Sequence, residues 1–405
     1  MTGPGLGSSL GSGAPMRAAF LLGLLSGWGC ASDPPPAPEA PAPAPTGARP
    51  EHAWPRTYAA ELGALDHQIA FARGQLEKRE DLPLKWALLI DQLAERARLT
   101  GEWDDWAAAE AAARRAFETN PTAPPRLAKA NLDFSLHRLD AALGADDDDL
   151  RAAIAMERGD YATALVGFRR SHAAEPNHTS LARLAMHAGH TGDPAGAEAL
   201  FRQAQVAYHG RSHRPRAWLA LQLGLLALDA GRYDLALAHY RDADAAMTGW
   251  WLVREHVAEA ERLAGRPETA REIYAALVAE TQNPEFMDAL ALTLRDLGRD
   301  DEANRWVAEA GRAWDRRIAQ FPEAAWGHAL DHWLLLTDDA ERALDLAQRN
   351  EANRPNGEAS LKLAAALRKA GRLDEARARV AAVRSSGWRS PALAALEAAL
   401  GPPTR

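Results

Sequence analysis

Histidine residues at helical spacing are the side chains of this sequence that are best suited to metal chemistry. His187 and His190 stand three residues apart. His328 and His332 stand four apart, with Asp331 between them. Residues three or four apart lie on one face of a helix, and imidazoles with a carboxylate suit zinc, copper or nickel. The simpler interpretation is that these histidines fill half-exposed faces of amphipathic helices, and we therefore expect no bound metal and no cofactor.

The spacings typical of common catalytic sites are not found in this sequence. It has no phosphate-binding Gly-rich loop ending in Lys, no G-x-S-x-G turn and no H-E-x-x-H. The single cysteine, Cys30, excludes both a disulfide scaffold and a metal site with several thiolates. We therefore expect that the protein is not an enzyme.

The overall charge gives no support to nucleic acid as a partner. Lys and Arg number 47 against 55 Asp and Glu, which leaves a net charge of -8. Proteins that bind the anionic backbone of DNA or RNA usually carry a basic excess. We therefore expect protein or peptide partners and no nucleic acid.

The segment 16–30, MRAAFLLGLLSGWGC, has the pattern of an export leader. Its apolar run, residues 18–25, is too short to span a bilayer, which takes about 20 residues. Residues 1–15 carry no charge, so we expect translation to begin at Met16, where Arg17 supplies the positive charge.

The end of this leader resembles the lipobox of bacterial lipoproteins, in which a small residue, here Gly29, precedes a lipidated cysteine. The resemblance implies a signal peptide over 1–29, lipidation of Cys30 and a lipid-anchored place in the bacterial cell envelope, on the periplasmic face or in the outer membrane. Residues 30–56 are rich in Pro and Ala. They are predicted to be a disordered linker, in which the roughly 20 residues 31–50 reach about 60 Å at about 3.1 Å per residue.

A glycine followed five residues later by an alanine recurs along the rest of the chain. Successive turn residues are 33, 39, 34, 33, 40 and 33 residues apart. A period near 34 predicts stacked helical hairpins, with two insertions of about six residues. Small residues before each turn and large ones after it predict closely packed helix pairs with an apolar stripe. The pairs are Gly159/Ala164, Gly192/Ala197, Gly231/Ala236, Gly265/Ala270, Gly298/Ala303 and Gly371/Ala376, and Asp338/Ala343 fills the gap in the same register.

This pattern resembles the tetratricopeptide repeat (TPR) family, most closely over residues 218–242, WLALQLGLLALDAGRYDLALAHYRD. The resemblance implies an all-α fold, a right-handed superhelical solenoid of helical hairpins. We assign seven repeats to residues 145–390, helices with degenerate hairpins to 57–144, and a capping helix with a tail to 391–405.

In the TPR family the first helix of each hairpin lines a concave groove that holds a protein or peptide. TPR domains that clamp a terminal carboxylate use Lys and Asn there, and neither is found on the corresponding faces of this sequence. The groove residues that the resemblance implies are Met186, Trp218, Leu221, Leu225, Glu255, Glu259, Asp288, Leu292, His328, Asp331 and His332.

Asp331 differs from its counterparts, because the other six repeats all place Ala or Gly at that position. A buried carboxylate without a partner is costly. We therefore expect His328 or a nearby Arg to pair with it.

Two functions remain open at this stage. The leading one is a lipid-anchored, exported TPR scaffold that binds protein or peptide partners in a cell-envelope assembly or secretion process. The alternative is a periplasmic ligand-binding, metal-binding or sensory module that uses the cluster of His328, Asp331 and His332.

Overall fold

Residues 56–401 are described in a computed structural model, in which they form twenty α-helices. From α2 onward the helices pair as consecutive antiparallel hairpins, and this confirms the predicted all-α solenoid of TPR-like hairpins. The predicted signal peptide, Cys30 and the linker as far as residue 55 lie outside the described residues. The helices are α1 Tyr58–Lys78, α2 Pro83–Thr100, α3 Trp103–Thr119, α4 Arg126–Ser135, α5 Leu139–Ala142, α6 Asp148–Glu157, α7 Tyr161–Ala174, α8 His178–His190, α9 Pro194–Ala207, α10 Arg214–Asp229, α11 Tyr233–Ala246, α12 Trp251–Leu263, α13 Pro267–Thr281, α14 Pro284–Asp296, α15 Asp300–Gln320, α16 Pro322–Leu335, α17 Ala340–Asn353, α18 Gly357–Lys369, α19 Leu373–Ser386 and α20 Pro391–Leu400.

The turn inside each repeat follows the glycine period found in the sequence. All six predicted turn glycines have positive φ, a conformation in which other residues are strained. The small residue before the turn and the large residue after it pack together inside the hairpin. At Gly224, for example, an added Cβ would lie only 2.1 Å from a ring carbon of Tyr240. The period therefore specifies both the turn and the helix contact that follows it.

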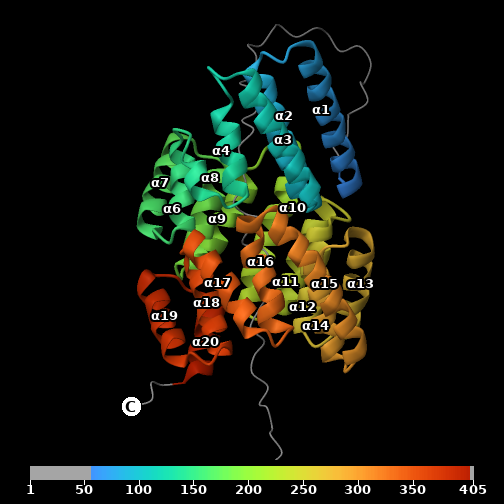
Figure 1. The fold of residues 1–405 in the computed structure, drawn as a ribbon, viewed down its shortest axis with the longest axis vertical. Helices are drawn as coiled ribbons and strands as arrows, with labels where there is room; N and C mark the ends of the chain where they lie inside the picture. Colours follow the sequence, from blue (N-terminus) through green and yellow to red (C-terminus); the bar gives the residue numbers. More distant parts are fainter. Residues whose placement is uncertain (1–55, 402–405) are drawn as a thin grey trace, which may run out of the picture.

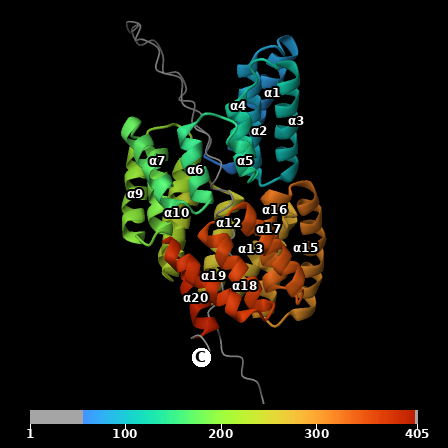
Figure 2. The same cartoon turned by 60° about the vertical axis from the view of Figure 1, so that its left-hand side comes forward.

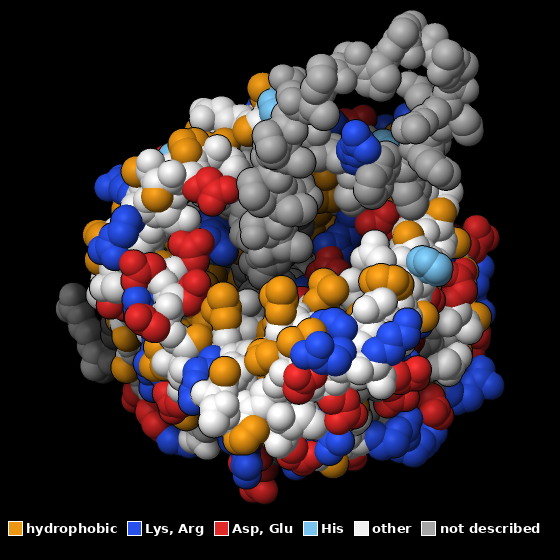
Figure 3. All heavy atoms as spheres, turned by 90° about the horizontal axis from the view of Figure 1, so that it is seen from above, with side chains coloured by type: hydrophobic (Ala, Val, Ile, Leu, Met, Phe, Trp, Pro, Cys, Tyr) orange, Lys and Arg blue, Asp and Glu red, His pale blue; other side chains and the backbone are white. Residues whose placement is uncertain are grey.

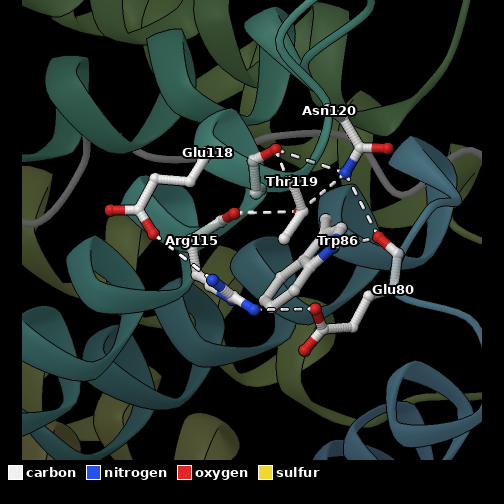
Figure 4. A network of polar contacts seen from close by, with 7 residues as sticks. Glu80, Trp86, Arg115, Glu118, Thr119 and Asn120 are labelled. Atoms are coloured by element: carbon white, nitrogen blue, oxygen red, sulfur yellow. Dashed lines mark hydrogen bonds and ion pairs between the residues drawn. The ribbon is translucent and has the colours of Figure 1, made fainter.

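The amino-terminal helices form a smaller bundle whose loops are fixed by polar contacts (Figure 4). The Glu80 carbonyl oxygen accepts hydrogen bonds from Trp86 Nε1 at 2.9 Å and from Asn120 Nδ2 at 3.2 Å. The Glu80 carboxylate pairs with Arg115 at 2.9 Å. These contacts join the α1–α2 connection to the end of α3.

The two insertions take different forms. The second one lengthens a helix, since α15 runs over 21 residues without interruption. The first one is a loop before α10, and its Ser212 Oγ donates a hydrogen bond to Glu61 of α1 at 3.1 Å. The first insertion thus joins the middle repeats to the amino-terminal bundle.

The array of hairpins coils back on itself instead of remaining open. Figures 1 and 2 show α17–α20 lying beside α6–α9, with α1–α4 above the middle repeats. One hydrophobic core extends from Leu65 to Leu400. Repeats in an open solenoid contact only their neighbours, so these contacts between distant repeats are a property of this chain.

The amino-terminal bundle contacts the middle repeats through aromatic side chains. Trp251 Nε1 on α12 donates to the Leu99 carbonyl at 2.8 Å. Trp103 packs on Phe321, with ring centroids 5.6 Å apart, and the Arg317 guanidinium lies 5.1 Å from the Trp103 ring. The end of the α2–α3 hairpin therefore rests on α12, α15 and the start of α16.

The early repeats contact the last two hairpins through a second set of bonds. The Tyr161 hydroxyl accepts from the Gly357 backbone N–H at 2.7 Å, and the His190 carbonyl accepts from the Arg389 N–H at 2.8 Å. The His190 imidazole stacks on Trp388 with centroids 4.4 Å apart. We call these contacts the closing contacts.

Two turn glycines allow a direct test of this closure. Gly159 and Gly231 both have positive φ, but an added Cβ meets the Pro355 carbonyl oxygen at 2.6 Å at the first position and nothing within 4 Å at the second. We expect Gly231→Ala to cost about 1–2 kcal/mol from the left-handed backbone alone. Gly159→Ala should cost roughly 1–2 kcal/mol more, because it also displaces a closing contact. Urea unfolding of the two variants measures the difference, and equal losses would show that the 159–355 contact does not form.

The surface of the coiled array carries charges of both signs. On the face seen from above, acidic and basic side chains lie next to one another rather than in separate fields (Figure 3). Among residues 56–401 no helix combines the length and the apolar character needed to cross a bilayer.

Candidate functional site

A partly enclosed apolar cavity of about 600 Å³ lies between the early repeats and the last two hairpins. It is formed by the inner helices α8, α10 and α12 on one side and by α16, α18 and α20 on the other. Its volume is within the range of small-ligand sites, roughly 300–1,000 Å³. The large apolar side chains of its wall are Met186, Phe201, Leu225, Leu226, Leu228, Leu334, Leu335, Leu361, Trp388, Leu393 and Leu396.

The carboxyl-terminal helix α20 supplies part of that wall. Leu393 and Leu396 project from α20 and are buried, and both line the cavity. Glu397 pairs with Arg384 of α19 at 2.5 Å at the same edge. The helix therefore covers the last repeat and also closes one side of the cavity.

The residues expected in the groove divide into two groups. Four of them line the cavity: Met186, Leu225, Glu259 and Asp331. The others lie on α10, α12, α14 and α16, and their side chains are buried or half-buried between neighbouring helices. These are Trp218, Leu221, Glu255, Asp288, Leu292, His328 and His332.

Asp331 pairs with a lysine, so the partner expected for it from the sequence was wrong. Lys362 Nζ on α18 donates to Asp331 Oδ2 at 2.9 Å and to the Gly327 carbonyl at 2.9 Å. Burial raises the pKa of Asp331, and Lys362 opposes that rise. Burial alone would lower the pKa of Lys362, but Asp331 and Glu358 raise it above its usual value. The cavity wall therefore contains a lysine, although none was expected on the groove faces. This Lys362 is already paired with a carboxylate.

The histidines of α16 are each paired with a carboxylate of α14. His332 Nδ1 lies 2.7 Å from Asp288 Oδ1, and Trp314 Nε1 donates to Asp288 Oδ2 at 2.7 Å. His328 Nδ1 lies 3.1 Å from Glu285 Oε1. Burial raises the pKa of Asp288 although His332 and Trp314 lower it. For Glu285, burial raises the pKa, but His328, Arg317 and Lys362 together lower it below its usual value. Both histidines therefore join neighbouring hairpins.

His187 and His190 of α8 have separate partners. His187 Nε2 lies 2.9 Å from the Tyr161 carbonyl oxygen. His190 stacks on Trp388, and burial lowers its pKa to about 4. The two imidazoles therefore serve different contacts.

The lowered pKa of His190 predicts that the stability of the fold depends on pH. The imidazole of His190 stays neutral in the folded chain down to about pH 4 but protonates near pH 6.5 once unfolded. The unfolded chain therefore binds more protons between these values, and stability falls as the pH falls. We expect a loss of about 1–2 kcal/mol between pH 7 and pH 4.5 beyond that of His190→Phe, which keeps an aromatic ring at the stack. Urea unfolding at both pH values measures this difference, and identical pH dependence would contradict it.

Glu255, His256 and Glu259 on α12 are the one group of three or more potential metal ligands within residues 56–401. His256 Nδ1 lies 3.1 Å from Glu255 Oε2 and 3.4 Å from Glu259 Oε2. His256 and Glu259 line the cavity. His256 was not singled out from the sequence, although its spacing of three residues from Glu259 was visible there.

Comparisons with known proteins are limited to overall structure. No family model matches the chain, and no curated protein matches it. A tetratricopeptide repeat protein from Parabacteroides merdae is similar over 69% of this chain and 98% of its own, with 15% identity and a TM-score of 0.39. Pseudomonas aeruginosa pilF is similar over 53% of this chain and 93% of its own, with 17% identity and a TM-score of 0.34. Human IFIT1 is similar over 81% of this chain and 78% of its own, with 14% identity and a TM-score of 0.45. The helices and turns described above make this chain a TPR-like, all-helical repeat protein.

Proposed function

We propose that this protein is a scaffold that binds an apolar segment of a protein or peptide in the cavity between its early and late repeats. The cavity itself is the observation that carries the proposal. Inner-helix side chains such as Met186 and Leu225 are only half-buried there, and they can contact an inserted side chain. Burial of apolar surface contributes about 25 cal/mol per Å².

The polar part of the wall favours a partner with a positive charge beside its apolar residues. Glu259, Asp331 and Glu358 line the cavity, and Lys362 is the cation that faces the last two. Over the whole wall, the carboxylates of Asp229, Glu259, Asp331, Glu358 and Glu397 outnumber the cations of Lys362, Arg384 and Arg389. A bound Lys or Arg side chain offsets that excess, because opposite charges attract strongly in a partly desolvated site.

The envelope location rests on the sequence. The pattern that ends at Cys30 supports lipidation, and the Pro- and Ala-rich residues 30–56 would hold the repeats away from the membrane. In this proposal the protein acts in envelope assembly or secretion. Intact-mass measurement of the protein from its native membrane fraction tests this part. A mature chain that begins at acylated Cys30 supports the proposal, and a soluble chain that retains Met1 or Met16 and a free thiol contradicts it.

Site-specific photocrosslinking tests the cavity as the binding site. A photoreactive phenylalanine at Leu225 is expected to form a covalent adduct with a partner in cells, whereas the same residue at Val206, which is 77% exposed on α9, serves as the control. Mass spectrometry then reports the crosslinked segment. Adducts at position 206 but not at 225 would rule out the cavity as the binding site.

The alternative module based on His328, Asp331 and His332 has less support. Each of the three side chains is already paired with a residue of a neighbouring helix. The three side chains also do not come together as a group of potential metal ligands within residues 56–401.

A further inference from the structure

Three side chains of α12 form a compact set of nitrogen and oxygen ligands. One ligand atom from each of Glu255, His256 and Glu259 lies within 4.8 Å of the other two. The two measured separations, 3.1 and 3.4 Å, involve His256 Nδ1. In a tetrahedral site with bonds of about 2.0–2.1 Å, neighbouring ligand atoms are about 3.3 Å apart. The observed separations therefore suit a transition-metal ion without rearrangement of the helix.

Two of these side chains are deeply buried and have polar atoms without a hydrogen-bond partner. The Glu255 side chain is 2% exposed, and neither of its carboxylate oxygens has a hydrogen-bond partner. Its ion-pair partner is the neighbouring His256, whose Nε2 also has no hydrogen-bond partner. Buried polar atoms are nearly always satisfied in folded proteins, because leaving them unpaired is costly. A cation between these ligands would satisfy Glu255.

The surrounding charge also favours a cation. Glu285 of α14 and Asp229 of α10 act on this group electrostatically, in addition to its own two carboxylates. His256, Glu259 and Asp229 line the cavity. An ion can therefore reach these ligands from the cavity.

We propose that Glu255, His256 and Glu259 bind one divalent transition-metal ion, such as Zn²⁺, in the wall of the cavity. The ligand set of one imidazole and two carboxylates suits such ions. The site is distinct from the His328, Asp331 and His332 cluster. It also does not depend on the proposed protein-binding role, because it needs no partner in the cavity.

The nearby carboxylate–imidazole pair of Glu285 and His328 provides the matched control. Glu285 and His328 offer one carboxylate and one imidazole in a similar setting between α14 and α16. They belong to no group of three ligands within residues 56–401. Glu285→Gln therefore disturbs a buried carboxylate–imidazole pair without removing a proposed ligand.

Metal binding by the purified full chain, after removal of bound metal with a chelator, tests the proposal. We expect one Zn²⁺ per chain in equilibrium dialysis, and Co²⁺ as a spectroscopic probe should give visible d–d absorption bands. Glu259→Gln, at a half-buried position, should weaken Zn²⁺ binding at least tenfold. Glu285→Gln removes only a longer-range charge and should weaken binding by no more than about threefold.

Three results would overturn the proposal: no Zn²⁺ bound by the parent protein, unchanged affinity in Glu259→Gln, or an equal loss in both variants. Circular dichroism of each variant confirms that the helices are formed, so a loss of binding is not confused with unfolding. Photocrosslinking at Leu225 is a separate measurement. The absence of a crosslink at Leu225 would contradict the protein-binding proposal but not the metal site. The absence of metal binding would contradict the metal site but not the protein-binding proposal.

Discussion

Replacing Lys362 with Met is expected to lower the free energy of unfolding by about 3–5 kcal/mol, the usual cost of removing one partner from a buried ion pair. Lys362 Nζ lies 2.9 Å from Asp331 Oδ2, and their side chains are 13% and 9% exposed. Without the ammonium group, the Asp331 carboxylate stays buried without its partner cation. Chemical unfolding followed by circular dichroism measures the loss.

A double variant separates the ion pair from simple packing. All the other repeats place Ala or Gly at the position of Asp331, so Asp331→Ala restores a residue that the helix crossing accommodates elsewhere. We expect Asp331→Ala combined with Lys362→Met to recover most of the stability lost in Lys362→Met, since a buried pair can often be replaced by apolar residues at little cost. If the two losses simply add, the pair does not interact as described.

Trp388→Ala should lower the free energy of unfolding by about 3–5 kcal/mol and open the coiled array. Trp388 is buried, stacks on His190 and lies 5.7 Å from the Tyr161 ring, so it belongs to the closing contacts. Large-to-small changes of buried aromatic residues usually cost this much. Because the lost contacts join distant repeats, we also expect a larger radius of gyration in small-angle X-ray scattering.

The matched control is Trp306→Ala on α15, a half-buried tryptophan outside the closing contacts. It should cost about 1–2 kcal/mol and leave the radius of gyration unchanged, because only part of its surface is removed from water. An expanded Trp306→Ala protein, or a Trp388→Ala protein with the parent's dimensions, would contradict a role for Trp388 in closure.

Closure explains why the cavity is a different kind of site from an open TPR groove. An open solenoid presents one extended concave surface. Here α16, α18 and α20 lie opposite α8, α10 and α12, so the inner surface is divided, and much of it is buried. A variant that opens the array should therefore also lose the crosslink expected at Leu225.

Part of the site could be predicted from the sequence. Met186 and Leu225 line the cavity because they lie on the inward face of a first helix, as the repeat register implies. Lys362, Trp388 and Leu393 were missed as lining residues. They become part of the site only through closure of the array and the position of α20, and no local pattern marks either one.

The sequence by itself determined the helices, their turns and their pairing into hairpins. Those features depend on residues within one period, such as a left-handed Gly231 or a small Gly224 opposite Tyr240, and each acts over a few residues. The tertiary structure alone decided that the array closes, that Asp331 pairs with Lys362 and that a cavity remains between early and late repeats. The physical reason is that a repeat pattern specifies contacts between adjacent hairpins. The overall curvature of the array is the sum of small rotations between adjacent hairpins. Residues such as His190 and Trp388 therefore come together only in the folded chain.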